Sequence, residues 1–256
     1  MDEDTRGVMF VATGAKYVAA ANEAARSVAS KDPELGLALA TDRTDLADKA
    51  LFQHLVDVRD GHARSKVDYL ARTPFHRTLY LDTDIRLLHS VSDVFDVLDR
   101  FDIALAHANA RNRSATRSVW RTQIPDAFPQ LNGGVIAYRS TDKVLSFLSE
   151  WSKAYREADF KKDQVTLREL LWCSELRINI LPPEYNIRYS RYLDFWNSKE
   201  AKPRILHLAL YHDRGQPAAK VLKRRTIEVA EDVYVSARSF VGALTKAAML
   251  GSRHLR

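Results

Sequence analysis

Short apolar runs alternate with amphipathic helical stretches along most of this 256-residue chain. The runs have the length and composition of β-strands and cover residues 8–13, 35–40, 77–81, 102–106, 131–138, 178–181 and 204–210. Helical patterns follow the first run up to residue 28 and cover residues 64–72, 91–98, 143–158 and 162–171. Helices that alternate with strands usually connect parallel neighbours, so the pattern predicts an α/β fold with a mostly parallel central sheet and flanking helices.

The positive charge is concentrated at the carboxyl end of the chain. The net charge is +6, and residues 220–256 hold eight Lys/Arg against three Asp/Glu, a balance of +5 that leaves +1 for the rest. A nucleic-acid-binding domain is expected to be basic over a whole face and to carry a recognised motif, and neither is visible. We therefore predict no nucleic-acid partner, a main domain over residues 1–217 and a basic helical extension over residues 218–256.

The extension combines a basic cluster at residues 220–225 with apolar residues near helical spacing at 233–250. Such a stretch suits either docking on the main domain or contact with an anionic membrane surface. The single cysteine, Cys173, excludes an intrachain disulfide, and its apolar helical neighbours predict a place in the core. No signal peptide or apolar run of about 20 residues is visible. We expect a cytoplasmic protein, with peripheral contact to the inner face of the membrane as an option.

Two carboxylates stand where the apolar run at 77–81 ends, in the sequence Asp82-Thr83-Asp84. Residues i and i+2 of a strand share a face, and the carboxyl ends of strands border the ligand crevice in open α/β sheets. Two hard oxygen ligands at that place suit Mg²⁺ or Mn²⁺ carrying a diphosphate. Two capping aspartates before a turn would give the same pattern.

Other phosphate-binding classes fit less well. The chain has neither the Gly-x-x-x-x-Gly-Lys-Ser/Thr nor the Gly-x-Gly-x-x-Gly loop. Haloacid-dehalogenase-like phosphatases also carry Asp-x-Asp after a strand, with the first Asp as nucleophile. That pattern expects Thr or Val where this chain has Arg86, and it expects the motif on the first strand.

Four blocks occur in an order that resembles the GT-A glycosyltransferases. They are Phe10-Val11-Ala12-Thr13-Gly14, Leu79-Tyr80-Leu81-Asp82-Thr83-Asp84, Leu131-Asn132-Gly133-Gly134-Val135 and Asp163-Gln164. The likeness is greatest to the retaining galactosyl- and glucosyltransferases of glycosyltransferase family 8, the glycogenin and lipopolysaccharide-galactosyltransferase type. The resemblance implies a nucleotide-diphosphate-sugar donor, with UDP as the expected nucleotide, and a divalent metal, Mn²⁺ or Mg²⁺.

The resemblance also assigns roles to residues. It places the metal on Asp82 and Asp84, with His207 as the third ligand and His212 as its competitor. It assigns the donor to a set of residues along the chain: Thr13, Tyr17, Asp42, Arg64, Lys66, Thr83, His107, Asn132 and Gly133. It assigns Asp163 and Gln164 to the transferred sugar and the reacting centre, which makes them the candidate catalytic residues.

The chain departs from the family after the metal histidine. The family has a Lys-Pro-Trp whose lysine binds the diphosphate, whereas this chain reads His212-Asp213-Arg214-Gly215-Gln216-Pro217, with Lys220 beyond. Arg214, Lys220 or a residue from elsewhere could replace that lysine. The segment from Pro182 to Arg188 resembles one that closes the acceptor side in related transferases, although two prolines also suit a rigid surface turn.

These assignments predict transfer of a sugar to a glycan or lipid-linked hydroxyl acceptor, with retention at the anomeric carbon. The arginine-rich stretch at 109–130 is long for a loop and is expected to lie over the active site. A non-catalytic GT-A-like nucleotide-binding scaffold is the alternative.

Overall fold

The structure is a computed structural model that describes residues 5–111, 117–189 and 192–212 of the chain. It divides into two compact units, Met1–His212 and Asp213–Arg256. The second unit lies outside the described residues, and so do Arg214, Lys220 and the predicted basic extension. Among the helices of the described part, none has both the length and the apolar character that a membrane span requires.

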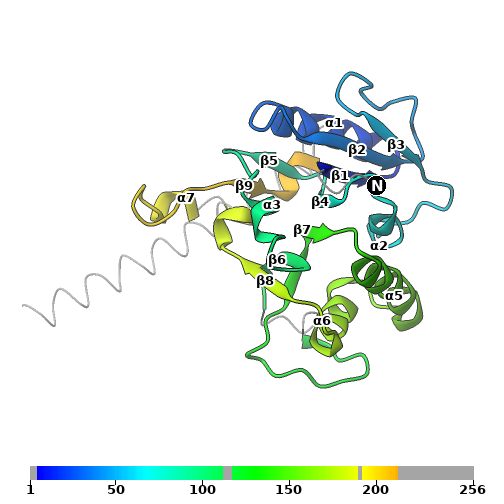
Figure 1. Cartoon of the computed structure of the whole chain (residues 1–256), viewed down its shortest axis with the longest axis vertical. Helices are drawn as coiled ribbons and strands as arrows, with labels where there is room; N and C mark the ends of the chain where they lie inside the picture. Colours follow the sequence, from blue (N-terminus) through cyan, green and yellow to red (C-terminus); the bar gives the residue numbers. More distant parts are fainter. Residues whose placement is uncertain (1–4, 112–116, 190–191, 213–256) are drawn as a thin grey trace, which may run out of the picture. The chain divides into compact units, whose positions relative to one another are not determined.

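The first unit is an α/β domain around a seven-stranded sheet (Figure 1). Its strands are β1 (Arg6–Ala12), β2 (Gly36–Thr41), β3 (His54–Asp57), β4 (Arg77–Leu81), β6 (Ile103–His107), β7 (Leu131–Arg139) and β8 (Ile178–Leu181). They are ordered β3-β2-β1-β4-β7-β6-β8. Only β7 among these strands runs antiparallel to its neighbours, so the prediction of a mostly parallel sheet is confirmed.

Helices cover both faces of this sheet. The helices of the described part are α1 (Ala15–Ala29), α2 (Lys66–Tyr69), α3 (Val94–Val97), α5 (Asp142–Ala158), α6 (Gln164–Cys173) and α7 (Tyr192–Phe195), of which α7 lies away from the sheet (Figure 1). Three 3₁₀ turns, η1 (Leu70–Arg72), η2 (Pro183–Tyr185) and η3 (Ala209–His212), and a second sheet of β5 (Ile85–Leu87) and β9 (Ile205–His207) complete the described fold.

Strand β4 shows how the two faces are built. Leu79 and Leu81 are buried in the cluster that includes α1, whereas Tyr80 points to the cluster that includes α5 and α6. This alternation is the period of two expected for a strand buried on both faces. Figure 1 shows α1 on one side of the sheet and α5 and α6 on the other.

Strand order creates the place for a ligand. From β1 the chain moves outward through β2 to β3, and it then returns to the opposite side of β1 to form β4. Neighbouring parallel strands whose connections leave in opposite directions form a crevice at their carboxyl ends. Residues Ala12 and Asp82 therefore stand at the border of this crevice.

Several expectations about elements were wrong. Strand β3 was not predicted because its residues are mostly exposed at the sheet edge and carry no apolar run. The expected strand at 204–210 is shortened to β9 and is followed by η3, and the helical pattern at 91–98 gives only the single turn α3. Cys173 is exposed. The buried face of α6 includes Leu167 and Leu171, and Cys173 lies on the opposite, solvent-facing side of the helix.

Candidate active site

A cavity of about 720 Å³ opens at the carboxyl ends of β1 and β4. It is lined by most of the residues that the sequence singled out: Thr13, Tyr17, Arg64, Lys66, Asp82, Thr83, Asp84, Asn132, Gly133, Gln164 and His207. These residues come from segments far apart in the chain, and the topology brings them to one crevice. The volume is in the range of sites that bind ligands the size of a nucleotide.

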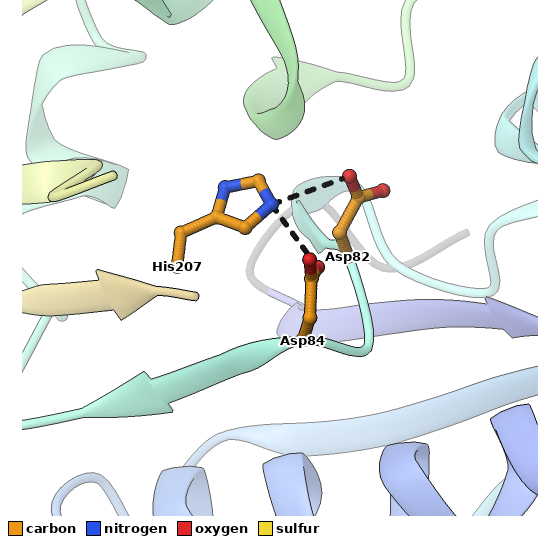
Figure 2. Close-up of side chains that lie close together, drawn as sticks. All are labelled: Asp82, Asp84 and His207. Carbon is orange, nitrogen blue, oxygen red and sulfur yellow. Dashed lines mark ion pairs between the residues drawn. The ribbon is translucent and has the colours of Figure 1, made fainter. Parts of the chain in front are cut away.

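Asp82, Asp84 and His207 form a compact cluster in this cavity (Figure 2). One ligand atom from each residue lies within 4.8 Å of the other two. The Nε2 of His207 is 3.0 Å from Oδ1 of Asp84 and 3.6 Å from Oδ2 of Asp82. Asp82 directly follows β4 and Asp84 directly precedes β5, and His207 ends β9, which pairs with β5. The β5–β9 pairing thus places the histidine opposite the carboxylates.

A buried asparagine fixes the orientation of the His207 ring. The Nδ1–H of the His207 ring donates to Oδ1 of Asn186 at 2.7 Å, and both residues are buried. Nε2 is thus the ring nitrogen that faces the two carboxylates, and a bound metal would take its lone pair. A metal-ligating histidine is usually held in this way by an acceptor on its other nitrogen. The cluster, with two carboxylates and one imidazole, fits Mn²⁺ or Mg²⁺.

The two oxygens of Asp82 have different surroundings. Its Oδ1 accepts a hydrogen bond from the Tyr80 hydroxyl at 2.6 Å and lies 3.3 Å from Nζ of Lys66. Its Oδ2 faces His207. Burial opposes the charged form of Asp82, but Lys66 and then His207 outweigh it and lower its pKa. The carboxylate is therefore held ionised, with one oxygen left for a metal.

Asp84 is also held ionised. Burial opposes its charge, yet the nearby His207 ring holds its pKa well below the usual range. Tyr80 behaves in the opposite sense: burial and then the adjacent Asp82 raise its pKa well above the ordinary value. The phenol therefore stays protonated and donates to Asp82.

Lys66 is the centre of a second network. Its Nζ donates to the carbonyl of Gly133 at 2.6 Å and lies 3.2 Å from Oδ2 of Asp163. Burial lowers the pKa of Lys66, but Asp163 and Asp82 outweigh this effect and raise it. Arg64 completes the network, with Nε 3.6 Å from Oδ1 of Asp163. Lys66, Asp163 and Arg64 thus connect the Asp82 carboxylate to the start of α6.

Two glycines on β7 bring the backbone close to this chemistry. A Cβ at Gly134 would lie 2.3 Å from Cε1 of His207 and 2.5 Å from Oδ2 of Asp82. A Cβ at Gly133 would meet Asp163 and Lys66 at 3.0 and 3.2 Å. Contacts under 3 Å are not tolerated, so a side chain at position 134 would force Asp82 or His207 to move.

His212, the competitor for the third ligand position, has a different place. Its Nε2 is within 2.7 Å of the Thr83 hydroxyl, and its ring packs edge-on against Tyr17 at 5.0 Å. Its Nδ1 is 3.9 Å from Oδ2 of Asp84. Burial lowers its pKa. His207 therefore occupies the cluster, and His212 supports the loop around it.

Three predicted residues do not line the cavity. Asp42 accepts a hydrogen bond from the backbone N–H of Gly14 at 2.8 Å, and so holds the turn between β1 and α1. Asp163 is buried behind Lys66 and Arg64. His107 ends β6 and pairs with Leu131. Their predicted roles as donor or catalytic residues stay predictions.

The arginine-rich stretch packs on α6 in its described part. Arg168 donates to the carbonyls of Pro125 and Phe128, and Glu169 accepts from the backbone N–H of Arg121. None of the described residues between 109 and 130 lines the cavity.

The sequence did not single out several residues that matter here. Tyr80 looked like an ordinary apolar strand position. Asn186 lies in the segment from Pro182 to Arg188, but its contact with His207, 21 residues away, was not predicted. Lys162 and His62 line the cavity but sit in polar segments without a motif, and Arg188 lines it although the sequence placed its segment, from Pro182 to Arg188, on the acceptor side. The one available signal was a tyrosine two residues before Asp82, on the same face of the strand.

Comparison with known proteins gives a consistent result. A family model described as nucleotide-diphospho-sugar transferase matches residues 76–217. No curated protein matches the chain.

Solved structures share the fold. The galactosyltransferase LgtC, in complex with donor and acceptor sugar analogues, is 16% identical, with a TM-score of 0.58 over 79% of this chain and 87% of that chain. The glycosyltransferase GlyE of Streptococcus pneumoniae TIGR4 is 18% identical, with a TM-score of 0.52 over 79% of this chain and 55% of that chain. The bifunctional glycosyltransferase WbbM is 13% identical, with a TM-score of 0.56 over 80% and 46%.

Proposed function

The chain belongs to the nucleotide-diphospho-sugar transferase family and is a nucleotide-sugar glycosyltransferase, and we propose that it moves a sugar from a UDP-linked donor to a hydroxyl acceptor with the help of a divalent metal. The resemblance read from the four sequence blocks is thereby confirmed, and the family match favours a transferase over a haloacid-dehalogenase-like phosphatase. The observation that carries the proposal is the cluster of Asp82, Asp84 and His207 at the border of a nucleotide-sized cavity.

The cluster would hold Mn²⁺ or Mg²⁺. Three observations support this: both carboxylates are held ionised, Nε2 of His207 faces them, and Gly134 leaves room for nothing larger than hydrogen beside them. A bound divalent ion would act as a Lewis acid that stabilises negative charge on the departing diphosphate. Tyr80 and Lys66 keep Oδ1 of Asp82 occupied, so this residue offers the ion its Oδ2 alone.

The diphosphate also needs a cation from the protein. Arg64 and Lys66 line the cavity as donor-binding candidates, and each also shares its charge with Asp163. Arg188 lines the cavity, is partly exposed, and has Nη1 3.9 Å from Oδ2 of Asp84. A guanidinium matches phosphate oxygens bidentately. We therefore assign to Arg188 the role of the lysine that this chain lacks after its metal histidine.

The sugar would lie toward the start of α6. Gln164 lines the cavity there, and its amide Nε2 donates to the carbonyl of Leu131 at 3.1 Å. Among the described residues that line the cavity, the only carboxylates are Asp82 and Asp84, and both belong to the cluster. A double displacement would need a free carboxylate at the anomeric carbon. Retention by front-face substitution beside Gln164 is therefore the proposed route.

A glutamine also lies in the active site of LgtC, since one solved structure is of its active-site Gln→Glu mutant. In the present chain, Asn132 is a further amide in the cavity, and its Oδ1 accepts from the backbone N–H of Gly134.

The acceptor is proposed to be a glycan or lipid-linked hydroxyl. The support is the family and the acceptor sugar analogue bound by LgtC. Contact of the basic extension with the inner face of the membrane, and a cytoplasmic location, remain proposals from the sequence. Sedimentation with anionic liposomes at low and high salt tests the membrane contact. The proposal predicts that the protein sediments with the liposomes at low salt, and failure to do so would refute it.

The proposal is tested by following the turnover of UDP-glucose and UDP-galactose with Mn²⁺, Mg²⁺ or EDTA. Asp82→Ala is expected to remove metal-dependent turnover. The matched control is Asp45→Ala, because the carboxylate of Asp45 is exposed and pairs with Arg43 outside the cavity. Full activity of Asp82→Ala would refute the site. An inverted anomer in the product, observed by NMR, would refute retention alone. A scaffold protein would show no turnover under any condition.

A further inference from the structure

The turn His62–Ser65 carries Arg64 to the cavity. Ser65 is buried, and its backbone N–H donates to the carbonyl of His62 at 3.0 Å. The Ser65 hydroxyl accepts from the backbone N–H of His62 and lies 2.7 Å from the same carbonyl. These contacts close the turn, but they do not fix the direction of Arg64, which is its third residue.

The ring of His62 uses both of its nitrogens. Nε2 is 2.7 Å from Oδ2 of Asp68, and Nδ1 accepts from the backbone N–H of Arg64 at 3.2 Å. An ionised carboxylate only accepts hydrogen bonds, so the proton must be on Nε2. Nδ1 is then free to accept. A single neutral tautomer satisfies both contacts.

Asp68 connects this ring to the long helix α5. Its Oδ1 accepts from the Ser152 hydroxyl at 2.5 Å and pairs with Nη2 of Arg156 at 2.7 Å. Burial opposes its charge, but Ser152, His62 and Arg156 together lower its pKa. Tyr155 of the same helix lies parallel to the His62 ring, with centroids 6.3 Å apart. The Asp68 carboxylate, which belongs to α2, is therefore held in place by residues of α5.

These contacts form a continuous path from α5 through Asp68 and His62 to Arg64. The Arg64 side chain then lines the cavity and lies 3.6 Å from Asp163. We propose that His62 is a positioning residue, which links Asp68 to the Arg64 backbone and so presents the Arg64 guanidinium to the donor. This inference rests on the proposed function, because it concerns the affinity and turnover of a nucleotide-sugar donor.

Two isosteric variants separate the two contacts. In His62→Asn the side-chain oxygen can accept from the Arg64 N–H, as in an Asx-turn, but the contact with Asp68 is lost. In His62→Gln the amide can still donate to Asp68, but the acceptor for Arg64 is lost. The loss of one hydrogen bond corresponds to about a fivefold decrease in kcat/KM. We expect His62→Gln to lower kcat/KM for UDP-glucose or UDP-galactose about fivefold and His62→Asn to lower it less. The reverse order would overturn the proposal.

A double-mutant cycle with Arg64→Ala tests whether the effect passes through Arg64. Coupled residues give non-additive losses, and independent ones add. His62→Gln should cause its fivefold loss in the wild-type background and almost none in Arg64→Ala. Equal losses in both backgrounds would show a direct or merely structural role. His54→Gln, on the exposed edge strand β3, is the control, and thermal unfolding confirms that each variant folds.

A spectrum tests the geometry without enzyme turnover. Long-range ¹H–¹⁵N correlations of histidine-labelled protein report the tautomer, and the His62 signal is identified by its loss in His62→Gln. We expect a protonated Nε2 and an unprotonated Nδ1 near neutral pH. The opposite tautomer or an imidazolium would overturn the inference. A wild-type protein that turns over no nucleotide sugar would instead refute the proposed function, and this spectrum keeps the two failures distinguishable.

Discussion

Gly134→Ala is the substitution whose effect can be worked out most directly from the structure. The new Cβ would lie 2.3 Å from Cε1 of His207, and an ordinary contact needs at least 3.4 Å. The two atoms must therefore move apart by about 1 Å. His207 cannot retreat easily, because its ring is bonded to Asn186 and its backbone N–H to the carbonyl of Ile187. Gly134 is tied in turn to Asp82, whose N–H donates to its carbonyl at 2.9 Å.

The size of the effect follows from the tolerance of metal sites. Metal–ligand distances deviate by no more than about 0.2 Å from their ordinary values, so a shift of about 1 Å moves a ligand well beyond that limit. A displacement of this size costs about 100-fold in a preorganised site. We expect Gly134→Ala to weaken Mn²⁺ binding about 100-fold. Overpacking should also destabilise the fold by about 1–3 kcal/mol.

The assay is a titration of Mn²⁺ followed by the electron paramagnetic resonance signal of the free ion. Gly133→Ala is the matched control for the metal site, because its Cβ would meet Asp163 and Lys66 rather than a metal ligand. Its Mn²⁺ affinity should stay within about threefold of the wild type, whereas Gly134→Ala should lose about 100-fold. Wild-type affinity in Gly134→Ala, in a protein that unfolds cooperatively, would refute the reasoning.

Three further predictions follow from individual contacts. Asn186→Leu removes the acceptor of Nδ1 of His207 and should weaken Mn²⁺ binding by about 10- to 100-fold; an unchanged titration would contradict this. Arg188→Ala should raise the KM for UDP-glucose or UDP-galactose by about 10-fold or more, because a charge-assisted hydrogen bond is lost, and the exposed Arg100→Ala should not. The pKa of Asp68 is lowered on folding, so its ionised form stabilises the protein above the ordinary carboxylate pKa, and this contribution is lost as the pH falls through the folded value. The difference in Tm between wild type and Asp68→Asn should therefore shrink from about pH 7 to about pH 3; a constant difference would exclude this source of stability.

Elements with strong local patterns could be predicted from the sequence. The apolar run of β4 followed by Asp82 and Asp84 placed the site at the end of a strand, because strand periodicity and the position of polar residues are local properties. The boundaries of β4 agree with the expectation at 77–81. The third member of the cluster came from the family resemblance, since nothing in the sequence around His207 distinguishes a ligand from a structural histidine.

Contacts that depend on tertiary packing could not be predicted. Asn186 follows a proline-rich turn, and only the bridge between Ile187 and Leu206 brings it beside His207. The relay through Asp68 joins α2 to α5 across 84 residues of chain. Cys173 shows the opposite error, in which apolar neighbours suggested burial although the helix turns that position to the surface.

The central claim is that a metal at Asp82, Asp84 and His207 binds the donor diphosphate, and calorimetry tests it most directly. UDP, GDP and CDP are titrated into the wild-type protein and into Asp82→Ala, each with Mn²⁺ and with EDTA. The account predicts that UDP binds at least about tenfold more tightly to the wild type when Mn²⁺ is present, a difference of about 1.4 kcal/mol, and that Asp82→Ala loses this dependence. Equal affinity with and without Mn²⁺, or no nucleotide binding at all, would contradict the account.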